Sequence, residues 1–236
     1  MSAEPRLVEV RRHVLKDNDV RARALRERWR ADRVFVVSIV SSPGSGKTML
    51  LEKTLAHLHQ EYRVAALVGD LATNNDAERL ARSRAPVKQI TTGTLCHLEA
   101  AMVERTLDGW DVGPLDFLFV ENVGNLVCPS SYDLGENLRL VIVSVTEGED
   151  KPLKYPTIFN SADLAIVSKI DLAVVVEFDE AALRRSIHSV RPGMPIVTLS
   201  AKTGVGMGGF FDLLVARRSS ATDSPSARPL AADGTI

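Results

Sequence analysis

Short apolar runs alternate with segments of helical periodicity through most of the chain. The apolar runs are rich in β-branched residues, and two of them end on an acidic residue. Such runs predict buried strands, and the periodic segments between them predict helices. We expect strands at residues 34–40, 62–70, 87–91, 115–121, 138–146, 164–169 and 195–200, and helices at 48–60, 94–107, 179–190 and 205–216. This alternation indicates an α/β fold with a mostly parallel, doubly wound sheet that carries helices on both faces.

The two ends of the chain depart from this pattern. Residues 7–30 carry apolar side chains on one helical face, which predicts one long helix or two short helices broken near residues 17–19. The many arginines of this segment are expected on its solvated face. Residues 217–236 are rich in Ser, Ala, Pro and Asp and are expected to be disordered. We therefore divide the chain into an N-terminal helical segment at 1–30, a main domain at 31–216 and a tail at 217–236.

The composition argues against several classes of protein. The 236 residues carry a formal net charge of -1, so no global basic field favours nucleic acid or a membrane surface as a partner. No run reaches the roughly 18 apolar residues that a membrane-spanning helix needs, and the first residues lack the apolar core of a signal peptide. We therefore expect a cytoplasmic protein. The two cysteines do not make a disulfide framework.

The turn after the first expected strand matches a phosphate-binding loop. It reads SSPGSGKT, which fits GxxxxGK[ST] except that Ser41 stands at the first glycine position. Gly44 and Gly46 allow the backbone to approach an anion closely, and the helix that follows adds the positive end of its dipole. Lys47 is expected to reach the β- and γ-phosphates, and Thr48 to ligate Mg²⁺. The nucleotide-binding residues predicted in this stretch are Gly44, Ser45, Gly46, Lys47, Thr48 and Met49. The fold class is thus narrowed to a P-loop NTPase.

Acidic residues after two other strands are candidates for the catalytic side of the nucleotide. Glu121 ends an apolar strand, where the acid of a Walker-B motif usually stands, and Gly124 is expected to donate its N–H to a γ-phosphate. We assign Asp76 to Mg²⁺ or its waters and Asp70 to positioning the attacking water. The alternative for both aspartates is an ordinary acid at a strand end or a turn. The predicted catalytic residues are Lys47, Asp70, Asp76 and Glu121, and the predicted Mg²⁺ ligands are Thr48, Asp76 and Glu121.

Two later stretches resemble the guanine-reading elements of GTPases. SKID, from Ser168 to Asp171, follows a strand and resembles NKxD with Ser in place of Asn. The carboxylate of Asp171 can accept hydrogen bonds from guanine N1–H and the 2-amino group, a donor pair that adenine lacks. The stem of Lys169 can lie along the base. The later SAK stretch, in which Ala201 would donate its N–H to guanine O6, consists of Ser200, Ala201 and Lys202. The SKID and SAK stretches follow the P-loop in the order found in GTPases, which favours GTP over ATP as the nucleotide.

Cys96, His97 and Cys128 are candidates for a second site. Thiolate and imidazole are suitable ligands for Zn²⁺ or Ni²⁺. Three ligands are one short of a closed tetrahedral site, so a water or a ligand from a second subunit would complete it, which favours sharing across a two-fold axis. The alternative is two packed cysteines and a histidine that caps the helix expected from Thr94 to Leu107.

Six stretches together resemble one family, the HypB hydrogenase maturation GTPases. The resemblance covers about residues 7–215, and its most specific parts are ENVGNLVCP and the Cys-His pair. The urease accessory GTPases share the P-loop architecture but carry a different metal motif. The six stretches are SSPGSGKT, GDxxxxxDA at 69–77, TTGTLCHLEA, ENVGNLVCP, DKPLKYP and SKIDL.

The resemblance implies a function for both sites. It implies GTP hydrolysis coupled to nickel delivery to the large-subunit precursor of [NiFe]-hydrogenase, with GTP-dependent formation of a homodimer. It also implies a metal site at the dimer interface on Cys96, His97 and Cys128, with nickel and zinc both open as the metal. Lys151 and Lys154 of DKPLKYP are expected to reach across that interface toward the nucleotide.

Two features of some family members are absent from this sequence. It has no Cys-x-x-Cys-Gly-Cys motif and no His-rich stretch, so we expect only the metal site of the G domain, at 31–216, and a HypA-type partner that supplies nickel. Two alternatives stay open. One is a GTPase chaperone for another metalloenzyme, such as urease or a cobalamin-dependent mutase. The other is a nucleotide-gated binding module whose hydrolysis is too slow to matter.

Overall fold

All seven described strands form one parallel sheet. The computed structural model describes residues 4–70 and 75–222, with side chains described except at 4–13, 75, 76 and 78. The order of the strands is β3-β2-β4-β1-β5-β6-β7, and every neighbouring pair is parallel. This confirms the predicted α/β class. The strands are β1 (Phe35–Ser41), β2 (Val64–Asp70), β3 (Val87–Thr91), β4 (Phe117–Glu121), β5 (Leu138–Ser144), β6 (Leu164–Ser168) and β7 (Ile196–Thr198).

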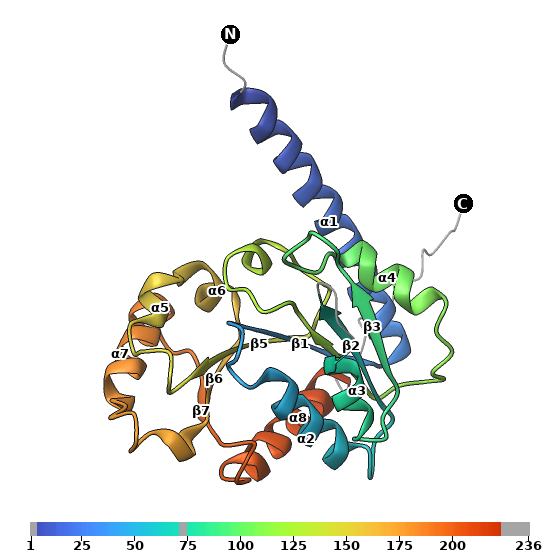
Figure 1. Ribbon diagram of the computed structural model, residues 1–236. Helices are drawn as coiled ribbons and strands as arrows, with labels where there is room; N and C mark the ends of the chain where they lie inside the picture. Colours follow the sequence, from blue (N-terminus) through green and yellow to red (C-terminus); the bar gives the residue numbers. More distant parts are fainter. Residues whose placement is uncertain (1–3, 71–74, 223–236) are drawn as a thin grey trace, which may run out of the picture.

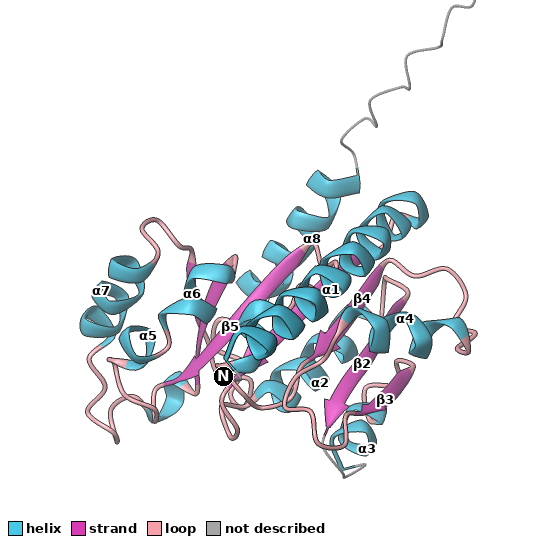
Figure 2. Ribbon diagram, turned by 90° about the horizontal axis from the view of Figure 1, so that it is seen from above, coloured by secondary structure: helices cyan, strands magenta, loops and turns pink. Residues whose placement is uncertain are grey.

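Helices cover both faces of this sheet (Figures 1 and 2). One face packs against α2, α3 and α8, and the other packs against α1, α4, α6 and α7. The helices are α1 (Glu4–Asp32), α2 (Lys47–Leu58), α3 (Asn75–Ala81), α4 (Ala100–Asp108), α5 (Lys151–Lys154), α6 (Pro156–Ser161), α7 (Glu180–Val190) and α8 (Met207–Thr222), with the 3-10 turns η1 (Cys128–Ser131) and η2 (Ile170–Leu172). The sheet is therefore doubly wound, as predicted.

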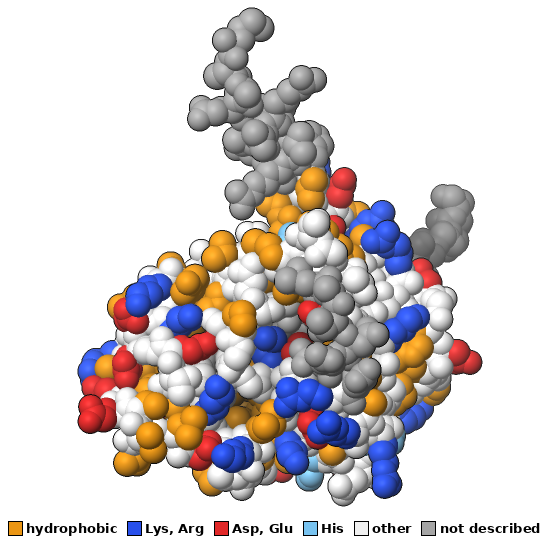
Figure 3. All heavy atoms as spheres, in the orientation of Figure 1, with side chains coloured by type: hydrophobic (Ala, Val, Ile, Leu, Met, Phe, Trp, Pro, Cys, Tyr) orange, Lys and Arg blue, Asp and Glu red, His pale blue; other side chains and the backbone are white. Residues whose placement is uncertain are grey.

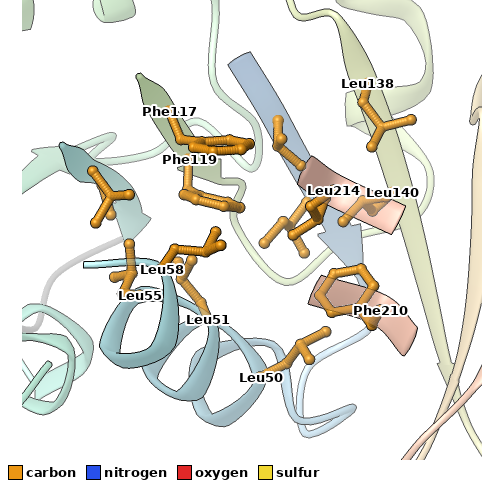
Figure 4. Packing of buried hydrophobic residues seen from close by; sticks show 14 of the residues in the cluster. Leu50, Leu51, Leu55, Leu58, Phe117, Phe119, Leu138, Leu140, Phe210 and Leu214 are labelled. Atoms are coloured by element: carbon orange, nitrogen blue, oxygen red, sulfur yellow. The ribbon is translucent and has the colours of Figure 1, made fainter. Parts of the chain in front are cut away.

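The continuous apolar strands follow from burial on both faces. Alternate residues of β1 enter opposite cores, so that Val37 and Ile39 face α2 while Val36 faces α1. Figure 4 shows the first of these cores, where leucines of α2 pack against Phe117 and Phe119 of β4 and residues of α8. Because neither face meets water, no polar alternation is needed in these strands.

Helix α1 is one uninterrupted helix, so the alternative of two short helices is wrong. Its N-terminal end projects away from the rest of the domain (Figure 1), while Leu25 and Trp29 join the core on the sheet. The predicted solvated arginines are exposed in part, but two of them also anchor the helix. Arg21 pairs with Glu104 of α4 at 2.7 Å. Arg26 pairs with the carboxylate of Asp133, also at 2.7 Å.

The expected helix from Thr94 to Leu107 is wrong at its start. Helix α4 begins at Ala100, with Glu99 at the N-cap position, so Cys96 and His97 lie in the preceding loop. Local sequence suggested a longer helix, but distant side chains bind the backbone here instead. The N–H of Leu98 donates to the Asn122 side chain, and that of Ala100 donates to a side chain of α1. Tertiary contacts therefore override the local preference.

Other element ends differ less from prediction. Asp179 caps α7 as expected, because its carboxylate accepts the N–H of Ala182. Helix α8 continues to Thr222, so residues 217–222, assigned to the disordered tail, are helical; residues 223–236 lie outside the described part. Arg218 explains the extension, because it pairs with Asp116 and lies over the rings of Tyr62 and Phe117. The short helices α5 and α6, which each carry a proline in their first turn, were not predicted.

The surface agrees with the near-neutral composition. On the face drawn in Figure 3, basic and acidic side chains are interspersed with hydrophobic ones. Within residues 4–70 and 75–222, no helix has the length and apolar character needed to cross a lipid bilayer.

Candidate functional site

The predicted phosphate-binding loop joins β1 to α2. Gly44 (φ +74°) and Gly46 (φ +97°) adopt left-handed backbone conformations, which favour glycine, and Gly46 is the N-cap of α2. Ser41, which replaces the usual first glycine, is fully buried, and its hydroxyl accepts a hydrogen bond from the Ser45 hydroxyl. The extra side chain is thus part of the loop's internal bonding. The loop has the form of an anion-binding nest at a helix N-terminus.

The predicted Mg²⁺ ligands Thr48 and Glu121 are in direct contact. Glu121 ends β4 beside Ile39 of β1, and its Oε1 accepts a hydrogen bond from Thr48 Oγ1 at 3.0 Å. The pair of oxygen donors suits Mg²⁺. Asp70 lies at the same edge of the sheet, at the end of β2. Asp76 belongs to α3, but its side chain lies outside the described residues, so its assignment stays a prediction.

Gly124 lies against the P-loop. A Cβ atom at this position would be 3.1 Å from Pro43 Cγ and 3.2 Å from Pro43 Cα. Any side chain here would therefore push against the loop. The contact places Gly124 beside the P-loop, and the donation of its N–H to a γ-phosphate stays a prediction.

The predicted base-reading residues are tied to the P-loop from the other side. Ser168 Oγ donates to the carbonyl of Ser45 at 2.7 Å, and Lys169 Nζ donates to the carbonyl of Gly44 at 2.6 Å. Asp171 is exposed in η2. The N–H of Ile170 donates to Leu199 O, which joins this turn to the SAK stretch. There Ser200 is buried and its hydroxyl accepts the N–H of Thr203, while Ala201 and Lys202 follow in the turn.

The three predicted metal ligands also meet, although they come from two separate loops. The sulfur atoms of Cys96 and Cys128 and a ring nitrogen of His97 all lie within 4.8 Å of one another, and the two sulfur atoms are 2.6 Å apart. Two thiolates that bind one zinc-sized ion tetrahedrally, each about 2.3 Å from it, lie roughly 3.8 Å apart, so the two sulfur atoms would have to separate by about 1 Å to share an ion. The donor set therefore suits a soft or borderline metal ion, and a small movement of the two cysteine-bearing loops would bring all three ligands to one ion.

The surroundings of His97 favour a ligand role over a packing role. The side chain is buried and its ring stacks on Tyr132, with ring centroids 3.9 Å apart. Among the described residues, neither ring nitrogen has a hydrogen-bond partner, and Nε2 lies 3.4 Å from a carboxylate oxygen of Glu99. Burial lowers the pKa of His97 despite this carboxylate, which keeps the imidazole in its neutral, metal-binding form. The histidine does not cap α4, so the alternative of a helix-capping role is wrong.

The Cys96 thiol lies against the Cys128 thiol. The hydrogen bond with Cys128 and burial together raise the pKa of the Cys96 thiol above its ordinary value. A bound divalent ion reverses this preference because it stabilises thiolates strongly.

Two asparagines that the sequence analysis did not single out join the segment after β4 to the Cys96 loop. Asn122 Oδ1 accepts from the N–H of Leu98 at 3.1 Å. Asn125 Nδ2 donates to the carbonyl of Cys96 at 3.3 Å, and its Oδ1 accepts the N–H of Val127 at 2.8 Å. Both lie within ENVGNLVCP, so the motif itself was the available signal. The segment 121–128 therefore contacts the P-loop through Gly124 and the Cys96 loop through Asn122 and Asn125, and it ends at Cys128.

The two lysines expected at a dimer interface form local contacts in the single chain. Lys154 Nζ pairs with Asp150 at 2.7 Å, and Lys151 Nζ lies 5.1 Å from the ring centroid of Tyr155. Their reach toward a second subunit stays a prediction.

Comparison with known proteins identifies the family. The CobW/HypB/UreG nucleotide-binding domain matches residues 35–198. The hydrogenase maturation factor HypB of Azotobacter chroococcum mcd 1 is 45% identical over 209 residues, which cover 87% of this chain and 68% of the relative. The hydrogenase/urease maturation factor HypB of Helicobacter pylori is 42% identical over 215 residues, which cover 89% of this chain and 88% of the relative.

Solved structures agree with these relatives. HypB from Helicobacter pylori in complex with nickel superimposes with a TM-score of 0.82 at 40% identity, covering 89% of this chain and 99% of that one. HypB from Archaeoglobus fulgidus gives a TM-score of 0.80 at 37% identity, covering 86% and 99%. The fold and the phosphate-binding loop thus define a nucleotide-binding protein of the P-loop GTPase class. The chain belongs to the CobW/HypB/UreG family, and within it to the HypB hydrogenase maturation factors.

Proposed function

We propose that the protein is a GTP-hydrolysing metallochaperone that delivers nickel during maturation of [NiFe]-hydrogenase. The observation that carries this proposal is the segment 121–128, which touches the P-loop through Gly124 and carries the candidate metal ligand Cys128. The Helicobacter pylori relative was solved in complex with nickel, which supports nickel as the cargo. The donor set of two cysteines and one histidine suits Ni²⁺ and also Zn²⁺.

In the proposed reaction the P-loop holds the phosphates of GTP. The backbone N–H groups of Gly44 to Met49 and the ammonium group of Lys47 would neutralise charge on the β- and γ-phosphates. Mg²⁺ would be held by Thr48, Glu121 and Asp76, and when bound it supplies charge neutralisation between the β- and γ-phosphates. Asp70 would orient the attacking water from the end of β2. Selection of guanine would rest on Asp171, Lys169 and the SAK turn of Ser200, Ala201 and Lys202.

Coupling between the sites would act through the shared segment. A γ-phosphate that accepts the N–H of Gly124 favours one position of the segment relative to Pro43. The side chains of Asn122 and Asn125 pass that position to the backbone of Cys96 and Leu98. The geometry of the two cysteines would therefore differ between the GTP-bound and GDP-bound states.

A second subunit would complete the metal site. The three ligands of one chain leave one tetrahedral position open, and a GTP-dependent homodimer would fill it or share the ion across its two-fold axis. A HypA-type protein would supply nickel, and the hydrogenase large-subunit precursor would receive it. A second candidate client is urease, since the Helicobacter relatives are hydrogenase/urease maturation factors by name.

Metal titration with matched variants tests this proposal. We expect the unaltered protein to bind one Ni²⁺ or Zn²⁺ per dimer and Cys128→Ser to bind it about 100-fold more weakly, because one thiolate ligand is lost. GTP affinity of the variant should be unchanged, which shows that the fold is intact. Equal metal affinity of the variant and the unaltered protein would contradict the assigned site, as would no metal binding at all.

A further inference from the structure

The side chain of Asn18 bridges two segments that are far apart in the sequence. It lies in the middle of α1 and is only 5% exposed. Its Oδ1 accepts the N–H of Ala100 at 2.9 Å, and its Nδ2 donates to the carbonyl of Asp133 at 2.8 Å. One amide group therefore holds both segments at a fixed separation.

Both bridged segments carry ligands of the candidate metal site. Ala100 begins α4 directly after the loop with Cys96 and His97, and Asp133 follows the turn η1 that begins with Cys128. The His97 ring also stacks on Tyr132, the residue before Asp133. The separation that Asn18 sets is thus the separation between the two ligand-bearing loops.

The same face of α1 fixes the second loop at further points. Arg26 Nη2 donates to both carboxylate oxygens of Asp133 at 2.7 and 2.8 Å. Gly135 (φ +78°) lies so close to the helix that a Cβ atom there would be 2.6 Å from the carbonyl oxygen of Ala22. Asn18, Ala22 and Arg26 are spaced by four residues, so they form one stripe along α1. The stripe holds the chain that follows Cys128.

A purely structural role for Asn18 predicts a different consequence. A buried amide that only satisfied polar groups would change global stability when removed, without a specific effect on the cysteines. The Arg21–Glu104 ion pair offers the comparison, since it also joins α1 to α4 but does not reach the second loop.

We propose that Asn18 is a positioning residue for the metal site, which sets the distance between the Cys96–His97 loop and Cys128. The biological meaning of this inference rests on the proposed nickel function. The spacing itself is a property of the metal-free chain and can be measured without any metal.

The first measurement uses the thiol–disulfide equilibrium of the full-length, metal-free protein in glutathione buffers. Oxidised glutathione takes two electrons and two protons from Cys96 and Cys128, which gives an intramolecular disulfide and two molecules of reduced glutathione. The ratio at equilibrium reports how often the two thiols meet. In Asn18→Leu we expect the apparent equilibrium constant to fall about tenfold, because both bridging hydrogen bonds are lost. Arg21→Ala should leave it unchanged.

The second measurement is nickel titration of the same variants. Asn18→Leu should bind Ni²⁺ about tenfold more weakly, with a weaker thiolate-to-nickel charge-transfer absorption. Its GTP affinity should equal that of the unaltered protein. If the unaltered protein binds no nickel, the proposed function fails, while the thiol equilibrium still tests the positioning role.

The inference is overturned if Asn18→Leu binds GTP normally and shows the thiol equilibrium of the unaltered protein. If Asn18→Leu does not fold, Asn18→Asp decides the question. That variant keeps an acceptor for Ala100 and removes the donor to Asp133. An equilibrium constant equal to that of the unaltered protein would then overturn the inference, and a lower one would support it.

Discussion

The nucleotide site and the metal site lie at the same edge of the sheet but depend on the chain in different ways. The P-loop is one continuous stretch, which the hydroxyls of Ser41 and Ser45 and the left-handed backbone of its glycines shape from within, while Ser168 and Lys169 bind two of its carbonyls. The candidate metal site joins two loops whose cysteines are 32 positions apart. The Asn18 side chain of α1 binds the N–H of Ala100 after the first loop, and Asn125 of the second loop binds the carbonyl of Cys96 in the first. We expect a site within one continuous stretch to tolerate substitutions elsewhere in the chain. A site assembled from two loops depends on the residues that hold those loops in place.

The largest expected effect is on the local site. Lys47→Ala should lower GTP affinity by about 100-fold or more, because the ammonium group of the buried Lys47 is expected to make charge-assisted hydrogen bonds to phosphate. Isothermal titration with GTP measures this. Lys53→Ala is the matched control, since it removes an exposed lysine from the same helix. Nickel affinity without nucleotide should be equal in all three proteins. A Lys47→Ala variant that keeps tight GTP binding would contradict the P-loop assignment.

The next effect concerns the choice of base. Asp171→Asn should weaken GTP binding about tenfold and reduce the preference for GTP over ATP, because an amide cannot accept both hydrogen bonds from guanine. Competition between labelled GTP and unlabelled ATP measures the ratio. Asp212→Asn, an exposed aspartate of α8, serves as the control. An unchanged ratio in Asp171→Asn would rule out this residue as the base reader.

A smaller effect tests the connection between the sites. Asn125→Ala should reduce the nucleotide dependence of nickel affinity about fivefold, because it removes the hydrogen bond to Cys96 and leaves both sites in place. Nickel titrations with GDP and with a non-hydrolysable GTP analogue give the ratio. The exposed Asn160 provides the control variant Asn160→Ala. Nucleotide dependence that persists undiminished in Asn125→Ala would mean that the coupling runs elsewhere.

The smallest expected effect is on stability and concerns Asp116 and Arg218, which lie far from both sites. Burial by itself raises the pKa of Asp116. The hydrogen bonds with Arg63 and the positive charge of Arg218 outweigh this effect and lower the pKa of Asp116 below its ordinary value. The ionised carboxylate of Asp116 therefore stabilises the folded state above about pH 4, which is the pKa of Asp in an unfolded chain. This contribution to the free energy of unfolding is lost as the pH falls through the lower pKa of Asp116 in the folded state.

Arg218→Ala should cost about 1 kcal/mol in free energy of unfolding near neutral pH, and less in acid. Urea unfolding at several pH values measures this, with the exposed Arg217→Ala as control. The two site affinities should be unchanged. A loss of nickel binding in Arg218→Ala would show that the metal site responds to any loss of stability, and the contrast between the sites would fail.

The sequence predicted what was locally encoded. All seven strands, the P-loop and the cap at Asp179 follow from apolar periodicity and short-range hydrogen bonding. The start of α4 at Ala100 was missed because Asn122 and Asn18 occupy the backbone groups in front of it. The continuation of α8 was missed because it depends on Arg218 meeting Asp116. These contacts join residues more than 20 positions apart, which no local pattern records.

The metal site shows the same division. Cys96, His97 and Cys128 were predicted as ligands from their chemistry and from a family motif, while spacing alone left packing as an alternative, and the structure brings the three together. The residues that hold the two ligand-bearing loops in place were not predicted. In the sequence of α1, Asn18 is one polar residue in a polar stretch, and nothing in the pattern marks it as a bridging residue.

The measurement that tests the central claim most directly is the nickel affinity of the unaltered protein with GDP and with a non-hydrolysable GTP analogue. The account predicts affinities that differ by about fivefold or more, because the γ-phosphate acts on the segment that carries Cys128. Equal nickel affinity in both nucleotide states would contradict the coupling of the two sites through residues 121–128.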